Sequence, residues 1–139
     1  MYRKIICAAD LSHSERAERI LKRASALVDG SGDIVLLHVI EDVPSYIVVN
    51  LPQEYVTDAI KDAEQKLLAI TRRLEIPAVV EVRAGVPETV LLAAAEEHKA
   101  DLILVASHVP NLSNYFLGAT ADRIVRYAKC SVLVDRQPE

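Results

Sequence analysis

Glycine is scarce in this sequence, with four residues in 139, and no glycine-rich binding signature is present. The chain has neither the G-x-G-x-x-G fingerprint of dinucleotide-binding folds nor the G-x-x-x-x-G-K-[ST] loop that cradles phosphates. It also lacks a G-x-S-x-G segment, in which a strained turn exposes a nucleophilic serine. These absences exclude the most recognisable nucleotide-binding loops and argue against a serine hydrolase of that type.

Cysteine and histidine are too few and too scattered for a metal site. Cys7 and Cys130 both lie in apolar segments. We expect them to be buried free thiols in a reducing cytoplasm rather than a disulfide or a metal pair. No histidine pair has the spacing of zinc ligands. A Ser-His-Asp set can be drawn from Ser107, His108 and Asp10, but any chain of this size offers such triples, so no catalytic residue is assigned.

Long apolar runs and an excess of positive charge are also absent. The opening stretch MYRKIICAADLS superficially resembles a signal peptide, but its apolar run, residues 5–9, is short and ends at Asp10. No segment approaches the length of a membrane span, so we expect no membrane insertion and a cytoplasmic protein. The formal net charge of −4 gives no indication of a surface that binds nucleic acid.

Apolar segments with the periodicity of strands alternate with segments that have the periodicity of helices. The chain is 51% hydrophobic, which excludes general disorder. Together the segments predict a single α/β domain, residues 1–139, with a parallel sheet, right-handed crossovers and helices on both faces. Buried-type runs predict strands over residues 4–9, 33–40, 78–84 (nearer an edge), 101–107 and 131–135. Helical stripes predict four helices. The first begins at a capping box formed by Ser12 and Glu15 and is stopped by Gly30–Gly32. The others lie between Pro52 and Pro77, from Gly85 to Lys99, and over residues 119–128.

Polar residues follow two of the predicted strands at the point where each ends. The stretch 101–121 reads as a buried strand, a polar loop at Ser107 and His108, and a helix that starts near Gly118. Backbone N–H groups at a helix start favour an anion, so this stretch predicts a phosphate site. Asp10 ends the first strand, and two roles stay open for it: a helix-capping carboxylate, or an acceptor for a ribose hydroxyl or adenine amine. His38, inside an apolar strand, is expected to be a hydrogen-bonded core histidine, and Ser12 is most simply a helix cap.

Four segments of the sequence resemble the universal stress protein family over essentially the whole chain. They are YRKIICAADLS at the start, IVLLHVI, LILVASH and, most specific, LGATADRIVRYAKCSVLVDR at the end. The resemblance implies a Rossmann-like fold, similar to adenine nucleotide alpha hydrolases, with an open five-stranded parallel sheet in the order 3-2-1-4-5. It also implies a homodimer and, as in many members, ATP binding.

The loop after the fourth strand departs from the family's ATP-binding motif, G-x2-G-x9-G-[ST]. Ala106 and Val109 stand at the first two glycine positions, Gly118 remains, and Ala119 replaces the hydroxyl residue. The loop is similar instead to a subgroup with S-H-R-P, some members of which bind ATP, although Val109 replaces the arginine. Valine before Pro110 favours an extended backbone, so the loop cannot wrap phosphate as glycine would.

The resemblance and the strand-end residues together imply two sets of site residues. One set holds ATP or another adenine nucleotide, with Mg²⁺ as a candidate companion of the phosphates, and the other forms a homodimer across the last strand, which we expect at a sheet edge. The nucleotide set is Ala9, Asp10, Leu11, Ser12, Val39, Ile40, Ala106, Ser107, His108, Pro110, Gly118, Ala119, Thr120, Ser131 and Val132. The interface set is Val132, Leu133, Val134 and Asp135.

Two function classes follow from these assignments. The first is a stress-response or regulatory protein that binds an adenine nucleotide at the carboxyl ends of the first and fourth strands. The alternative is a dimeric interaction protein of the same family that has lost the nucleotide, and a further protein partner is left open in both classes. Enzymatic activity is left open as at most slow ATP hydrolysis, for which Asp10 is the strong candidate base.

Overall fold

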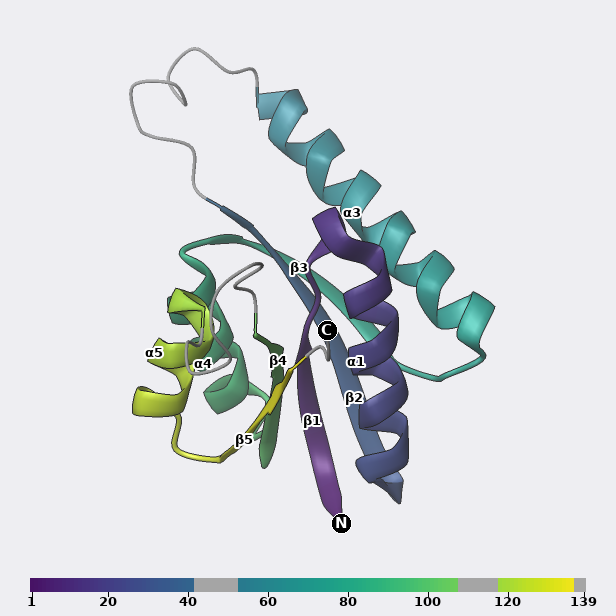
Figure 1. Ribbon diagram of the computed structural model, residues 1–139. Helices are drawn as coiled ribbons and strands as arrows, with labels where there is room; N and C mark the ends of the chain where they lie inside the picture. The colour runs from purple at the N-terminus through teal and green to yellow at the C-terminus, as the bar shows by residue number, and fades with distance from the viewer. Residues whose placement is uncertain (42–52, 108–117, 137–139) are drawn as a thin grey trace.

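The computed structural model describes residues 1–41, 53–107 and 118–136. The elements alternate along the chain as predicted (Figure 1). In order they are β1 (Tyr2–Ala8), the short 3-10 helix η1 (Leu11–His13), α1 (Ser14–Leu27), β2 (Val28–Glu41), α3 (Gln53–Leu74), β3 (Val79–Gly85), α4 (Pro87–Glu97), β4 (Leu102–Ala106), α5 (Ala119–Tyr127) and β5 (Ser131–Asp135).

All five strands are parallel and form one sheet in the order β3-β2-β1-β4-β5, which confirms the predicted fold. β1 is central, and its Cys7 pairs with Leu36 of β2 and with Leu104 of β4. The chain passes from β3 to β4 across the middle strands, so the strand order reverses between β1 and β4. In open parallel sheets, this reversal leaves a crevice at the carboxyl ends of the two strands.

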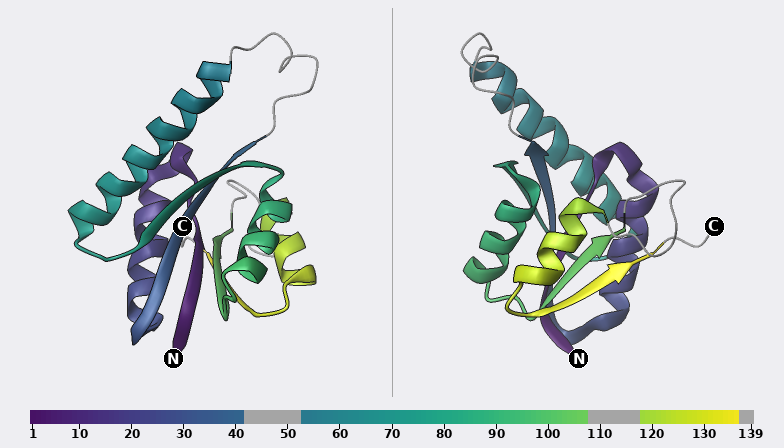
Figure 2. Two further views of the ribbon diagram at one scale, coloured as in Figure 1. Left: turned by 180° about the vertical axis from the view of Figure 1, so that it is seen from behind. Right: turned by 60° about the vertical axis from the view of Figure 1, so that its left-hand side comes forward.

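Two hydrophobic cores lie on the two faces of the sheet. Successive residues of a strand point to opposite faces, so Ile5 and Cys7 enter the core under α1 and α3, whereas Ile6 enters the core under α4 and α5. Figure 2 shows these helix pairs on opposite sides of the sheet. Burial raises the pKa of the Cys7 thiol, and Cys130 is half-buried rather than buried. Both thiols are free, as predicted.

The segment Gly30–Gly32 does not end the first helix, contrary to the sequence prediction. α1 ends at Leu27 and the chain passes straight into β2. Along β2 the pairing with β1 moves from Tyr2–Val28 to Lys4–Asp33, so β2 advances five residues while β1 advances two. A Cβ atom on Gly32 would lie 2.7 Å from the Arg3 carbonyl oxygen. The glycine is therefore needed for the close approach of two strands, not for a helix cap.

The predicted capping box is also wrong. α1 begins at Ser14, after η1, and its own N-terminal flanking residue makes no side-chain capping bond. The cap is instead Asp10, whose carboxylate accepts hydrogen bonds from the Ser12 backbone N–H, at 3.0 Å, and from the Ser12 hydroxyl. Asp10 therefore caps the N-terminus of η1, directly after the end of β1.

Candidate functional site

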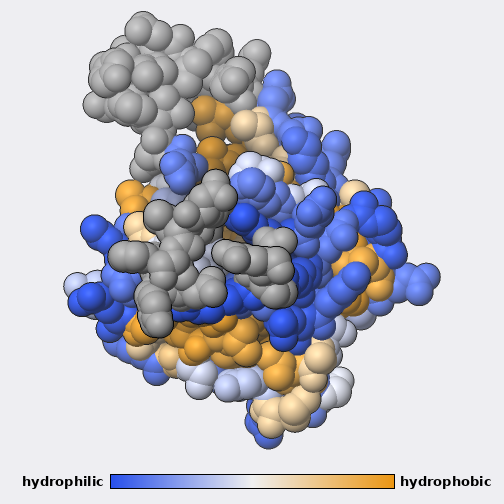
Figure 3. Space-filling model, in the orientation of Figure 1, coloured by the Kyte–Doolittle hydropathy of each residue, from blue (hydrophilic) through white to orange (hydrophobic). Residues whose placement is uncertain are grey.

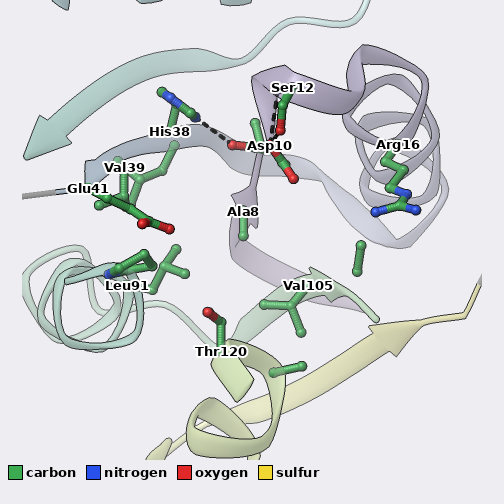
Figure 4. Close-up of a pocket in the computed structure, with 15 residues that line it drawn as sticks. Ala8, Asp10, Ser12, Arg16, His38, Val39, Glu41, Leu91, Val105 and Thr120 are labelled. Carbon is green, nitrogen blue, oxygen red and sulfur yellow. Dashed lines mark hydrogen bonds between the residues drawn. The ribbon is translucent and has the colours of Figure 1, made fainter. Parts of the chain in front are cut away.

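A pocket of about 340 Å³ opens at the carboxyl ends of β1, β2 and β4 (Figure 4). Its volume is in the range of small-molecule sites. The first turns of α1, α4 and α5 complete the wall. The residues that line it are Ala8, Ala9, Asp10, Ser12, Arg16, Leu37, His38, Val39, Glu41, Pro87, Leu91, Val105, Ala106, Thr120 and Ala121.

Asp10 is fixed in this wall by its own capping role. One carboxylate oxygen accepts both bonds from Ser12, which holds the side chain in place at the end of β1. A carboxylate has about four acceptor sites on two oxygens, so a cap does not exhaust its capacity. The capping role left open by the sequence is therefore present, and it is compatible with a second bond to a ligand.

His38 ties the ends of β2 and β1 together. Its Nδ1 lies 2.8 Å from the Ala9 carbonyl oxygen, and a carbonyl only accepts, so Nδ1 carries the proton. The predicted hydrogen bond is confirmed, but His38 is half-buried and lines the pocket instead of lying in the core. The sequence prediction did not place His38 in a pocket wall, because its neighbours in β2 are apolar and favour a purely structural role.

The charged groups of the pocket are spread across it. Figure 4 shows Arg16 on the α1 side and Glu41, at the end of β2, on the opposite side. Apolar side chains, among them Val39, Leu91 and Val105, line other parts of the wall. Arg16 and Glu41 were not among the sequence candidates. A signal existed for both, since Arg16 follows Ser12 by one helical turn and Glu41 is the first charged residue after an apolar strand.

The start of α5 supplies a fourth side of the pocket. Gly118 flanks the helix in an extended conformation and makes no side-chain capping bond, and Thr120 lies in the first turn. The Thr120 hydroxyl points into the pocket (Figure 4). N–H groups in the first turn of a helix lack intrahelical partners and carry partial positive charge, so this end of α5 favours an anion.

The structure brings six of the predicted nucleotide residues into this one pocket: Ala9, Asp10, Ser12, Val39, Ala106 and Thr120. Leu11, Ile40 and Ala119 are sequence neighbours of lining residues but do not line the pocket themselves, and neither does Gly118. His108 and Pro110 lie outside the described residues, as does Val109.

Three other predicted residues are placed differently. The backbone N–H of Ser107 donates to the Asp135 carbonyl oxygen at 3.0 Å, which extends the ladder between β4 and β5. That N–H group is therefore engaged within the protein. Ser131 pairs with Leu102, the first residue of β4, so Ser131 and Val132 lie toward the amino ends of the strands, opposite to the pocket.

The described parts of the chain show neither a metal cluster nor a membrane span. Within residues 1–41, 53–107 and 118–136, no group of three or more His, Cys, Asp or Glu side chains could hold a metal ion. Among the helices in those same ranges, none is both long and apolar enough to cross a bilayer.

Known proteins share both the sequence pattern and the fold. Universal stress protein G of Shigella flexneri is 28% identical over 142 aligned positions, which cover 98% of this chain and all of that protein. In structure, the chain is similar to hypothetical protein MJ0577, with a TM-score of 0.79 and 25% identity over 100% of this chain and 99% of that one.

A universal stress protein in complex with cAMP shares the fold, with a TM-score of 0.62 and 20% identity over 99% of this chain and 98% of that one. The model of the universal stress protein family matches residues 1–136. With the sheet order, the pocket and this match in agreement, the chain belongs to the universal stress protein family.

Proposed function

We propose that this protein binds an adenine nucleotide, ATP or a related molecule, in the pocket at the carboxyl ends of β1, β2 and β4. The observation that carries the proposal is the meeting of Asp10, Thr120 and the start of α5 in one cavity. A carboxylate can accept hydrogen bonds from the hydroxyls of a sugar, and the start of a helix attracts the phosphate. The cAMP complex of a protein with this fold supports the proposal.

The pocket walls suit the three parts of a nucleotide. Val39 and Leu91 offer apolar surface for a flat base on the β2 side. Asp10, whose carboxylate is bonded to Ser12 at the end of the central strand, would accept a bond from a ribose hydroxyl. Thr120 and the first turn of α5 then lie on the phosphate side. Mg²⁺ binds nucleotides through their phosphate oxygens, and we include it as their companion.

We further propose that two copies of the chain form a homodimer in the cytoplasm through β5. β5 is an edge strand, so one side of its backbone has no ladder partner among the residues that the structure describes. Figure 3 shows apolar side chains gathered on the face that carries β5. Val132, Leu133 and Val134 would form the contact. Asp135 is held inside its own chain by Arg19 and Arg23, so it would orient the strand end rather than pair across the dimer.

The proposed nucleotide site is tested by calorimetric titration of AMP and ATP into the wild type and two variants, Asp10→Ala and Asp10→Asn. The wild type should bind one nucleotide per chain. Both variants should bind about tenfold more weakly, because a charge-assisted hydrogen bond to the ribose contributes about 1.5–3 kcal/mol. Asparagine keeps an oxygen that can cap Ser12, so Asp10→Asn separates the loss of charge from the loss of the cap.

Three outcomes of these titrations distinguish nucleotide binding from its absence and a contact by Asp10 from a capping role. A wild type that gives no binding at millimolar nucleotide contradicts the proposed function. Weaker binding by Asp10→Ala alone means that Asp10 acts by capping η1 and not by contact with the ligand. Weaker binding by both variants supports the contact.

A further inference from the structure

The helix α1 brings a positively charged side chain to the pocket wall. Arg16 lines the pocket from the first turn of α1 (Figure 4). Among the described residues of the pocket wall, it is the one with a permanently positive side chain. The described residues of the wall include two carboxylates: Asp10, which is bonded to Ser12, and Glu41, which lies across the pocket from Arg16.

The loop that this family uses for phosphates carries no such charge. From Ala106 through Asp122 the sequence contains neither lysine nor arginine. The same stretch has alanine and valine where glycines would let the backbone wrap a phosphate. The described part of this stretch contributes the Thr120 hydroxyl to the pocket wall, next to the N–H groups at the start of α5. No lysine or arginine for a phosphate therefore comes from this stretch, whereas α1 brings Arg16 to the pocket wall.

Two other arginines of α1 hold the helix against the end of β5. Arg19 and Arg23 both form ion pairs with the buried Asp135, and Arg19 also donates to the Arg136 carbonyl oxygen. These contacts fasten α1 to the end of β5, beside the end of β4. They fix the helix whose first turn carries Arg16, so Arg16 is presented to the pocket from a rigid support.

We propose that Arg16 is the phosphate-binding side chain of this pocket and that it makes the site select nucleotides over nucleosides. The inference rests on the proposed function. An anion between Arg16 and the start of α5 would meet two positive groups, while Glu41 lies on the side of the pocket opposite Arg16. The same arrangement sets the direction of the ligand, with the phosphate toward α1 and the base toward the end of β2.

The test compares adenosine, AMP and ATP in calorimetric titrations of the wild type, Arg16→Gln and Lys22→Gln. Lys22 is an exposed cation on the same helix and is not in the pocket wall, so its variant controls for the change in net charge. Arg16→Gln should weaken AMP and ATP about tenfold or more and leave adenosine within about twofold. Lys22→Gln should bind all three ligands as the wild type does. Arg16→Lys should recover part of the lost affinity for AMP.

Raised salt supplies an independent readout. Affinity for AMP should fall with salt in the wild type and fall less steeply in Arg16→Gln, because screening acts on the removed charge pair. Equal losses for adenosine and AMP in a folded Arg16→Gln protein, or AMP binding as in the wild type, would overturn the assignment of Arg16 while the proposed nucleotide site stands. If the wild type binds neither AMP nor ATP, the proposed function itself fails.

Discussion

At the scale of single residues, Asp135 is a charged group that the fold buries. Its side chain is 7% exposed and is paired with Arg19 and Arg23 from α1. Asp135→Ala should lower the free energy of unfolding by about 1–3 kcal/mol, because both guanidinium groups lose their partner. The arginines are partly exposed and can turn to water, so the loss stays below that of a fully buried pair.

Thermal denaturation checks this prediction, with Asp62→Ala as the control. Asp62 pairs with Lys66 on α3, but both side chains are more than half exposed. Removing such a surface pair should change the free energy of unfolding by about 0.5 kcal/mol or less. Equal losses in the two variants would show that burial does not set the strength of the Asp135 contacts.

Single residues also show how far sequence reasoning reaches. Asp10 and Thr120 were predicted because residues at the ends of buried strands and at the starts of helices converge at one edge of a parallel sheet. Arg16 was missed because it falls among charged residues on the polar side of a helical stripe, where the pattern favours solvent exposure. Ser131 and Val132 were placed at the pocket by resemblance alone, and their position at the start of β5 puts them at the opposite end of the sheet.

At the scale of elements, Gly30 and Gly32, near the start of β2, differ in the space around them. A Cβ on Gly32 would meet the Arg3 carbonyl oxygen at 2.7 Å and the Val28 side chain at 2.8 Å, whereas a Cβ on Gly30 would meet nothing within 4 Å. Gly32→Ala should therefore lower the free energy of unfolding by about 1–3 kcal/mol through steric overlap. Gly30→Ala should be neutral or raise it by up to about 1 kcal/mol.

Chemical denaturation of the two alanine variants tests this difference. The two positions are two residues apart in the same strand, so each variant serves as the control for the other. If Gly30→Ala proves as destabilising as Gly32→Ala, the close approach of β1 and β2 at Arg3 is not the reason for the glycine.

The elements themselves were largely predictable, and their boundaries were less so. The periodicity of apolar residues predicted all five strands, and the resemblance to the universal stress protein family predicted their order in the sheet. The start and end of α1 were wrong for one physical reason: a local signal can serve two structures. Glycine after a helix fits a cap or a close strand contact, and Ser12 fits a cap for α1 or a donor to Asp10.

At the scale of the whole molecule, the backbone of β5 indicates how two copies would meet. The Asp135 carbonyl accepts from Ser107 and so faces β4. Because backbone groups alternate sides along a strand, those of Val134 face away from the sheet. Val134→Pro should thus remove an outward N–H without breaking the β4–β5 ladder, and it should shift the proposed dimer toward monomer.

Sedimentation velocity at micromolar concentration measures this shift, and circular dichroism of the same sample controls for the fold. A wild type that sediments as a monomer contradicts the proposed dimer. A folded Val134→Pro protein that remains dimeric would place the interface elsewhere than β5.

The central claim, that the pocket at the strand ends holds an adenine nucleotide, is tested most directly by an NMR titration of AMP into the wild-type protein. If AMP binds there, the Asp10, Val39 and Thr120 amide signals should show saturable shifts. The signals of Ser131, at the opposite end of the sheet, should stay unchanged. Shifts that cluster around Ser131, or no shift of the Asp10, Val39 and Thr120 signals at millimolar AMP, would contradict it.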